Sequence, residues 1–359
     1  MNFGKVKFVC ELPTTNHQLN MKSIFLTKHG APEAAFEIRE VAIPTPTENE
    51  VLIKVDAFGL NFADVMARKG LYDDCPPLPC VIGYEVVGRV ESIGKNISEI
   101  KNGDRVVSMT RFGGYSEYVV ADARAVIKIP EDISNTFAAA LTVQYGTAYY
   151  SAMIATKVFE GETILIHAAA GGVGTALVQL MKLRGAKIFG TCSSDEKVKF
   201  LRDLGVDYPI NYKTHDYKTE IKKILGTKKL NVVFDSLGGK YIRDGIKLLG
   251  PCGRMVCFGG AELNSATNIF SRWRKILQFG FYHPGLLMMQ SKSIIGVNML
   301  RVGDNQQVAM SEVISGLTEL IEQGKIKEAG GREYPVSQLA EAHTALENRS
   351  TMGKVVVSW

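Results

Sequence analysis

Residues 166–174 read Ile166-His167-Ala168-Ala169-Ala170-Gly171-Gly172-Val173-Gly174. An apolar run that predicts a strand precedes this stretch, and Val173–Leu183 predicts the helix that follows it. The small residues have A-x-x-G-x-x-G spacing, which lets a backbone come close to a pyrophosphate at the free N–H groups of a helix N-terminus. A tight turn without a ligand is the alternative, but the position between strand and helix favours dinucleotide binding. The candidate binding residues are Ala168, Gly171, Gly172, Val173 and Gly174.

Strands and helices alternate along the chain after this turn. The expected strands are Thr163–Ala168, Lys187–Thr191, Pro209–Tyr212, Val232–Asp235, Arg254–Phe258 and, after an interruption, Ile294–Val297. The expected helices between them are Val173–Leu183, Asp195–Leu204, Tyr217–Leu225 and Gly239–Leu249. This alternation predicts an α/β fold with a doubly wound parallel sheet of the Rossmann type.

The part of the chain that precedes the turn has a different pattern. Short β segments separated by Gly-containing turns predict a mostly β, partly open barrel. The last strand, Lys354–Val357, is expected to rejoin this barrel. We therefore expect a catalytic domain of residues 21–141 plus 299–359, and a dinucleotide-binding domain of residues 142–298 inserted into it. Residues 1–20 form an N-terminal extension, which is either part of the fold or dispensable.

Composition limits the classes of function. A chain of 359 residues with 46% hydrophobic residues can bury the cores of two domains. The net charge of +5 is too small for its length to indicate nucleic-acid binding. The six cysteines form no C-x-x-C pair, and the N-terminus has no secretion signal. A reducing compartment is therefore expected, and we expect a cytoplasmic protein.

The end of the second strand indicates which nucleotide is bound. NAD enzymes usually place an acidic residue here to hold the ribose hydroxyls, but Gly190–Ser194 contains no acid. Ser193, Ser194 and Lys197 instead offer hydroxyls and a cation to a 2′-phosphate. Ser194 also fits as the N-cap of the next helix, and the two roles are compatible. The segment favours NADPH.

Several motifs together resemble one family. The chain resembles the zinc-independent quinone oxidoreductase branch of the medium-chain dehydrogenase/reductase superfamily, and within it the vesicle amine transport protein group. The resemblance covers residues 21–359 and implies a GroES-like catalytic domain. The segments that carry it are Gly59–Asp64, Arg68, Gly70–Tyr72, Gly103–Val106, Ala168–Gly174 and Asp235–Gly239.

The resemblance implies specific roles for single residues. Zinc-dependent relatives carry Cys and His where this chain has Asn61 and Tyr84, and an amide and a phenol do not replace these zinc ligands, so no metal is expected. Lys197 and Tyr212 match positions at the adenosine 2′-phosphate. The positions that match the surroundings of the nicotinamide are Asn61 near its ribose, Thr147 close to its ring, and Phe258 and Gly259 in the loop beside it.

Hydride transfer without a metal depends on cofactor position, exclusion of water and hydrogen-bond donors. Quinones and α,β-unsaturated carbonyls suit such a site, because their π-systems delocalise the developing charge. Tyr72 is the best candidate donor, with a packing role as its alternative, and Asn61 is the second candidate catalytic residue. Asp64 and Arg68 have the i, i+4 spacing of an ion pair. A reductase of unsaturated acyl thioesters and a nucleotide-binding scaffold remain alternatives.

Residues 268–290 interrupt the α/β pattern. Phe270, Trp273 and Leu277 have the spacing of one helical face, and basic residues lie between them. We expect this face to pack against the substrate cleft or a partner subunit, which favours a homodimer. Peripheral contact with lipids is the alternative.

Overall fold

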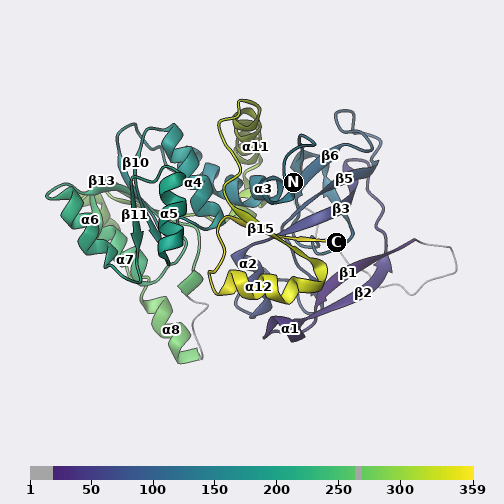
Figure 1. The fold of residues 1–359 in the computed structure, drawn as a ribbon, viewed down its shortest axis with the longest axis horizontal. Helices are drawn as coiled ribbons and strands as arrows, with labels where there is room; N and C mark the ends of the chain where they lie inside the picture. The colour runs from purple at the N-terminus through teal and green to yellow at the C-terminus, as the bar shows by residue number, and fades with distance from the viewer. Residues whose placement is uncertain (1–18, 263–268) are drawn as a thin grey trace.

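The computed structural model describes residues 19–262 and 269–359. An α/β half lies at the left of Figure 1 and a β-rich half at the right, with α3 between them. The N-terminal extension falls mostly on residues 1–18, and the first residue of the 268–290 interruption is Asn268, so both lie partly outside the described residues. The first strand, β1, begins at Asn20.

A six-stranded parallel sheet forms the α/β half, in the order β11-β10-β9-β12-β13-β14. Counted from β9, this is the 3-2-1-4-5-6 order of a doubly wound Rossmann fold. The predicted sheet is confirmed, including the sixth strand after the interruption. Its strands are β9 (Thr163–Ile166), β10 (Lys187–Cys192), β11 (Tyr208–Asn211), β12 (Leu230–Asp235), β13 (Leu249–Cys257) and β14 (Ser293–Gly296).

Alternate residues of β9 show how helices cover this sheet. Ile164 and Ile166 belong to the core that contains residues of α4, whereas Leu165 belongs to the core that contains residues of α6 and α7. Because successive strand side chains point to opposite faces, both faces of the sheet are covered. These helices are α4 (Gly172–Leu183), α5 (Asp195–Asp203), α6 (Tyr217–Leu225) and α7 (Lys240–Leu248).

Two sheets form the β-rich half. The larger follows the order β15-β16-β3-β5-β6-β8, with β7 paired to β3, and the smaller follows β2-β1-β4. The larger contains β3 (Glu50–Leu60), β5 (Glu85–Ile93), β6 (Arg105–Met109), β7 (Tyr118–Asp122), β8 (Val126–Lys128), β15 (Gly331–Pro335) and β16 (Lys354–Ser358). The smaller contains β1 (Asn20–Leu26), β2 (Phe36–Ala42) and β4 (Cys80–Val81). As expected, the last strand rejoins this half, because β16 pairs with β3.

Helix α3 (Asn135–Tyr149) joins the two halves. It contacts α4 on one side and β3, β5, β6 and β16 on the other. Residues 136–142 are all buried, so α3 has no polar face and no amphipathic period to reveal it in the sequence. The expected domain boundary between residues 141 and 142 falls inside this helix.

The remaining helices lie mostly at the edges of the two halves. They are α1 (Pro32–Ala35), α2 (Phe62–Arg68), α8 (Ile269–Leu277), α9 (Pro284–Met289), α10 (Met299–Asn305), α11 (Gln307–Glu322) and α12 (Leu339–Glu347). Within the described ranges, no helix is both long enough and apolar enough to cross a membrane.

Candidate active site

The glycine-rich turn connects β9 to α4. Gly171 is the N-cap of α4, and Ala168 has a left-handed φ of 51°. A Cβ on Gly174 would lie 2.4 Å from the Ala168 carbonyl oxygen, and a Cβ on Gly172 would lie 2.0 Å from Gln144. A side chain at Gly174 would therefore clash with backbone atoms, whereas one at Gly172 would require the buried Gln144 side chain to move. The structure brings the five candidate residues of this turn together at the N-terminus of a buried helix, where free N–H groups suit an anion.

A segment from the end of the chain lies across this turn. Gly353 pairs with Gly171, and the Gly353 N–H donates to the Ala170 carbonyl at 3.0 Å. This contact brings residues 348–352, which follow α12, to the edge of the nucleotide-binding half.

A cavity of about 360 Å³ opens beside this segment. Ser193, Lys197 and Tyr212 all line it, so the structure gathers the residues that sequence and resemblance assign to the 2′-phosphate. The full lining is Ser193, Ser194, Glu196, Lys197, Tyr212, Lys213, Asn348, Arg349, Ser350 and Met352. Three cations and one carboxylate give the cavity lining a net positive charge, and its hydroxyl groups can donate hydrogen bonds. Both properties suit a phosphate.

Lys197 connects two parts of the cavity lining, namely α5 and the segment that follows α12. Its Nζ donates to the Arg349 carbonyl at 2.6 Å, and burial lowers its pKa from the ordinary value. The Ser194 hydroxyl accepts from the Lys197 N–H at 3.3 Å, which confirms the N-cap expected for α5. Sequence reasoning missed Arg349, whose guanidinium donates to Glu262 at 3.3 Å. No local pattern in the sequence marks Arg349, because the tertiary contact of Gly353 with the glycine-rich turn brings it to this cavity.

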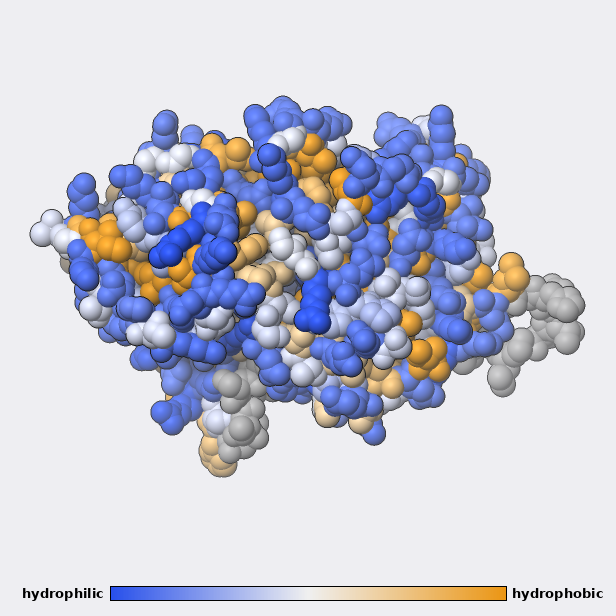
Figure 2. Space-filling model, viewed as in Figure 1, coloured by the Kyte–Doolittle hydropathy of each residue, from blue (hydrophilic) through white to orange (hydrophobic). Residues whose placement is uncertain are grey.

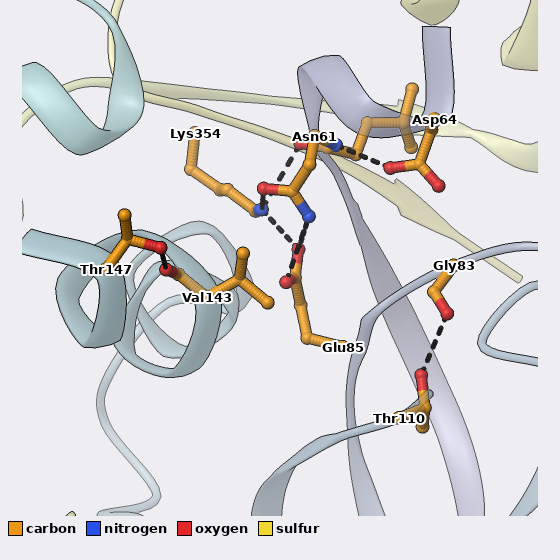
Figure 3. Close-up of polar contacts among 9 residues, drawn as sticks. Asn61, Asp64, Gly83, Glu85, Thr110, Val143, Thr147 and Lys354 are labelled. Carbon is orange, nitrogen blue, oxygen red and sulfur yellow. Dashed lines mark hydrogen bonds and ion pairs between the residues drawn. The ribbon is translucent and has the colours of Figure 1, made fainter. Parts of the chain in front are cut away.

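A buried polar cluster lies at the start of α2 (Figure 3). The Asn61 side-chain amide donates to both Glu85 oxygens, at 2.8 and 3.0 Å. Lys354 donates to Asn61 Oδ1 at 3.1 Å and forms an ion pair with Glu85. Asp64 accepts from the Asn61 backbone N–H at 2.7 Å. Every polar group of the Asn61 side chain thus has a fixed partner.

Burial determines the charges in this cluster. It raises the pKa of Asp64 to about 8. It also raises the pKa of Glu85, although the Lys354 ammonium acts in the opposite direction. The expected Asp64–Arg68 ion pair is wrong, because Arg68 instead forms its ion pair with Glu347 of α12. Arg68 binds this carboxylate and not that of Asp64, because α12, although distant in sequence, packs against α2.

One aromatic ring, that of Tyr84, lies against the candidate donor Tyr72. The rings of Tyr72 and Tyr84 meet edge to face at 6.2 Å, and Phe112 lies 5.3 Å from Tyr84. Burial raises the pKa of Tyr72, so its phenol keeps its proton at neutral pH. Thr147, on α3, donates its hydroxyl to the Val143 carbonyl at 2.6 Å, which leaves its oxygen to accept (Figure 3).

A second cavity, of about 550 Å³, lies at the carboxyl ends of β13 and β14. It is lined by Cys257, Gly296, Val297, Asn298, Arg301, Val302, Asn305 and Gln306. Phe258 and Gly259 follow Cys257 directly, and a Cβ on Gly259 would lie 2.6 Å from the Ser236 carbonyl oxygen. In open α/β sheets ligands bind at this end of the strands.

Two ion pairs join the wall of this cavity to the β-rich half. Arg301 of α10 pairs with Asp74, and Asp304 of the same helix pairs with Arg111. Asp74 belongs to the loop that carries Tyr72. The loop with the candidate donor is therefore tied to a helix at the carboxyl end of the parallel sheet.

The interruption contains two short helices, α8 and α9, and α8 projects from the molecule (Figure 1). Phe270, Trp273 and Leu277 are 82%, 60% and 58% exposed. Within residues 19–262 and 269–359, packing of this face into the chain's own cleft is therefore not found, because these three side chains stay largely exposed. Figure 2 shows apolar residues at the tip of the projection, on a face that is otherwise mostly hydrophilic.

Comparisons with known proteins place this fold and site in a family. The "Alcohol dehydrogenase GroES-like domain" family model matches residues 47–131, and the "Zinc-binding dehydrogenase" model matches residues 172–315. The human "Synaptic vesicle membrane protein VAT-1 homolog" is 35% identical over 345 residues, which cover 94% of this chain and 86% of that protein. Human "Quinone oxidoreductase" is 31% identical over 342 residues, 94% of this chain and 97% of that protein.

Solved structures of quinone oxidoreductases and enoyl reductases have the same fold as this chain. The Escherichia coli quinone oxidoreductase complexed with NADPH superimposes with a TM-score of 0.81 at 31% identity, over 94% of this chain and all of the other. The CurK enoyl reductase superimposes with a TM-score of 0.82 at 29% identity, over 94% and 99% of the two chains. The chain belongs to the quinone oxidoreductase branch of the medium-chain dehydrogenase/reductase superfamily, a branch that also contains the VAT-1 homologues. This confirms the family and the GroES-like and Rossmann architecture expected from the sequence.

Proposed function

We propose that this protein is an NADPH-dependent oxidoreductase that transfers hydride to a quinone or an α,β-unsaturated carbonyl without zinc. The observation that carries the proposal is the cavity where Ser193, Lys197, Tyr212 and Arg349 meet beside the glycine-rich turn. Hydroxyls and cations at the end of β10, in place of an acid, favour a 2′-phosphate over a free ribose hydroxyl. The NADPH bound to the similar Escherichia coli enzyme supports this assignment.

The described residues fit this cofactor along its length. The turn from Ala168 to Gly174 would hold the pyrophosphate with backbone N–H groups at the N-terminus of α4. Gly174 would keep α4 close to this turn, since a Cβ there would clash with the Ala168 carbonyl oxygen. Asn61, Thr147, Phe258 and Gly259 would lie around the nicotinamide. The bound cofactor supplies the hydride.

The remaining chemistry belongs to the protein. The Tyr72 phenol would donate a hydrogen bond to the acceptor oxygen, where negative charge develops. Glu85 and Lys354 fix the Asn61 amide, so that it would present one orientation to the ribose of the bound cofactor. The ring of Tyr84 beside Tyr72, backed by that of Phe112, would exclude water from the reacting atoms.

Zinc independence rests on the side chains at the family's ligand positions. Asn61 and Tyr84 stand where relatives have thiolate and imidazole. The Lys354 ammonium lies 3.1 Å from the Asn61 oxygen, so a second cation at this point would meet strong repulsion. Within residues 19–262 and 269–359, no cluster of three or more His, Cys, Asp or Glu side chains is positioned to hold a metal.

Two alternatives are kept. Similarity to the CurK enoyl reductase supports an unsaturated acyl thioester as acceptor. The exposed apolar face of α8 supports a second role in binding a partner, either as a homodimer contact or as peripheral contact with lipids. A homodimer in the cytoplasm remains our prediction.

The test is NADPH consumption with three panels of acceptors, namely quinones, enones and unsaturated acyl thioesters. We expect turnover with quinones or enones. Turnover confined to thioesters would support the first alternative. NADPH binding without consumption in any panel would contradict the enzymatic proposal and favour the binding role.

A further inference from the structure

Two thiols lie close together beside the candidate donor. The Sγ atoms of Cys75 and Cys80 are 3.9 Å apart. Cys80 is buried in β4, where it pairs with Leu26 of β1, whereas Cys75 is partly exposed in the loop that follows α2. Neither thiol has a part in the proposed hydride transfer.

The chain between the thiols holds them in proximity. The intervening residues are Pro76-Pro77-Leu78-Pro79, and three prolines sharply limit the conformations of so short a segment. Bond formation requires the sulfurs to approach to about 2.05 Å. Because Cys80 is fixed by strand pairing, Cys75 and its loop are the part that must move.

We propose that Cys75 and Cys80 form a reversible disulfide on exposure to a peroxide, and that its formation displaces the loop carrying Tyr72 and Asp74. One thiol takes an oxygen from hydrogen peroxide and becomes a sulfenic acid, with release of water. The second thiol then displaces the hydroxyl as a second water and closes the S–S bond. Two thiols and one peroxide thus give one disulfide and two waters, and a small dithiol reverses the reaction.

The thiol contact also favours reaction. Contact with the Cys75 thiol lowers the pKa of Cys80, and the same contact raises the pKa of Cys75, so Cys80 is the thiol that ionises first. A larger thiolate fraction speeds attack on a peroxide or a sulfenic acid. The exposed side of Cys75 gives small solutes access to the pair.

Contacts of Cys75 and its neighbour Asp74 connect this loop to the candidate active site. Its backbone N–H donates to the Tyr72 carbonyl at 3.1 Å, and its neighbour Asp74 pairs with Arg301, which lines the 550 Å³ cavity. A shift of Cys75 toward Cys80 therefore pulls on both the candidate donor and the cavity wall. This consequence for activity rests on the proposed function, whereas the disulfide itself does not.

The first experiment measures the bond. The full chain is titrated with hydrogen peroxide, alkylated with iodoacetamide and digested with trypsin, which leaves both thiols in the peptide Gly70–Arg89. We expect this peptide to lose two hydrogens and to resist alkylation, and dithiothreitol to restore both thiols. Cys252, an exposed single thiol, is the internal control. If peroxide oxidises Cys252 while Cys75 and Cys80 still react fully with iodoacetamide, the proposal is overturned.

The second experiment measures the coupling. Oxidation of the wild type should raise the acceptor KM several-fold, and reduction should restore it. The variants Cys75→Ser and Cys80→Ala should have the same activity as the wild type with free thiols, and this activity should not respond to peroxide. Cys252→Ser should still respond. A disulfide that forms without any change in the acceptor KM overturns the coupling to the Tyr72 loop. A disulfide in a protein that never consumes NADPH upholds the bond and contradicts the proposed function.

Discussion

Lys354 and Glu85 form a buried ion pair that ties the last strand, β16, to β5 across 269 positions of sequence. The ammonium also donates to the Leu60 carbonyl at 3.2 Å and to the Asn61 oxygen at 3.1 Å. Gly59 makes room for the pair, since a Cβ there would lie 2.0 Å from Glu85 Oε1. The pair therefore has one geometry, and that geometry fixes the orientation of Asn61.

Removal of one partner should strongly destabilise the protein. Lys354→Met leaves a buried carboxylate without its cation, and we expect the free energy of unfolding to fall by about 3–5 kcal/mol. Lys354→Met with Glu85→Gln should recover part of this loss in urea denaturation. The exposed pair Arg89–Glu131 is the matched control, where Arg89→Met should leave the free energy of unfolding nearly unchanged. Simple additivity of the two buried substitutions would contradict this account.

Asp64 should make stability depend on pH. Its pKa is raised to about 8 in the folded state, against about 4 in the unfolded chain. The folded state binds the proton more tightly, so the stabilisation is complete below about pH 4 and is lost as the pH rises through about 8. Asp64→Asn keeps an acceptor for the Asn61 N–H and removes the titration. We therefore expect the variant to lose less stability than the wild type between about pH 5 and about pH 9, by a few kcal/mol.

Urea denaturation at both pH values measures this difference. The same change in unfolding free energy in the wild type and in Asp64→Asn would show that Asp64 is ionised in the fold. That result would contradict the charge assigned to the buried cluster.

The sequence predicted those parts of the site that depend on short segments. The glycine-rich turn, Ser193 and Lys197 lie within the consecutive elements β9, α4, β10 and α5, where local spacing determines their positions. Arg349 lines the same cavity but lies 152 positions after Lys197 in the sequence. The contact of Gly353 with the glycine-rich turn brings Arg349 to the cavity, and such a tertiary contact has no local signal in the sequence.

Two other elements escaped prediction for related reasons. Helix α3 is buried on nearly every side, so it lacks the periodic polar face from which helices are predicted. Arg68 was assigned to the nearest carboxylate in sequence, but it binds Glu347, which only the packing of α12 on α2 brings close.

The purified protein should hold no stoichiometric zinc and should keep its activity in a chelator. The reasons are the amide and the phenol at the family's ligand positions, and the Lys354 ammonium beside Asn61. Elemental analysis before and after dialysis against EDTA measures this. About one tightly bound zinc per chain, lost together with activity, would contradict the metal-free proposal.

The exposed face of α8 should act in association between subunits. Replacement of Phe270, Trp273 and Leu277 by Ser should lower the mass in solution measured by light scattering, because a large exposed apolar patch promotes association. Val308→Ser, at an equally exposed residue on α11, should leave the mass unchanged. A triple variant that keeps its mass but no longer sediments with anionic liposomes would contradict the dimer prediction and support the lipid contact.

The most direct test of the central claim is the cofactor preference of Lys197→Ala. With a quinone acceptor, we expect the wild type to prefer NADPH and the variant to lose about 1.5–3 kcal/mol of NADPH binding, roughly a tenfold to hundredfold rise in its KM. The KM for NADH should hardly change, because NADH has no 2′-phosphate. Lys199→Ala, on the exposed side of the same helix, should leave both constants unchanged. An equal effect of Lys197→Ala on NADPH and NADH, or a wild type without preference, would contradict the assignment of this cavity to the 2′-phosphate and the NADPH-dependent function built on it.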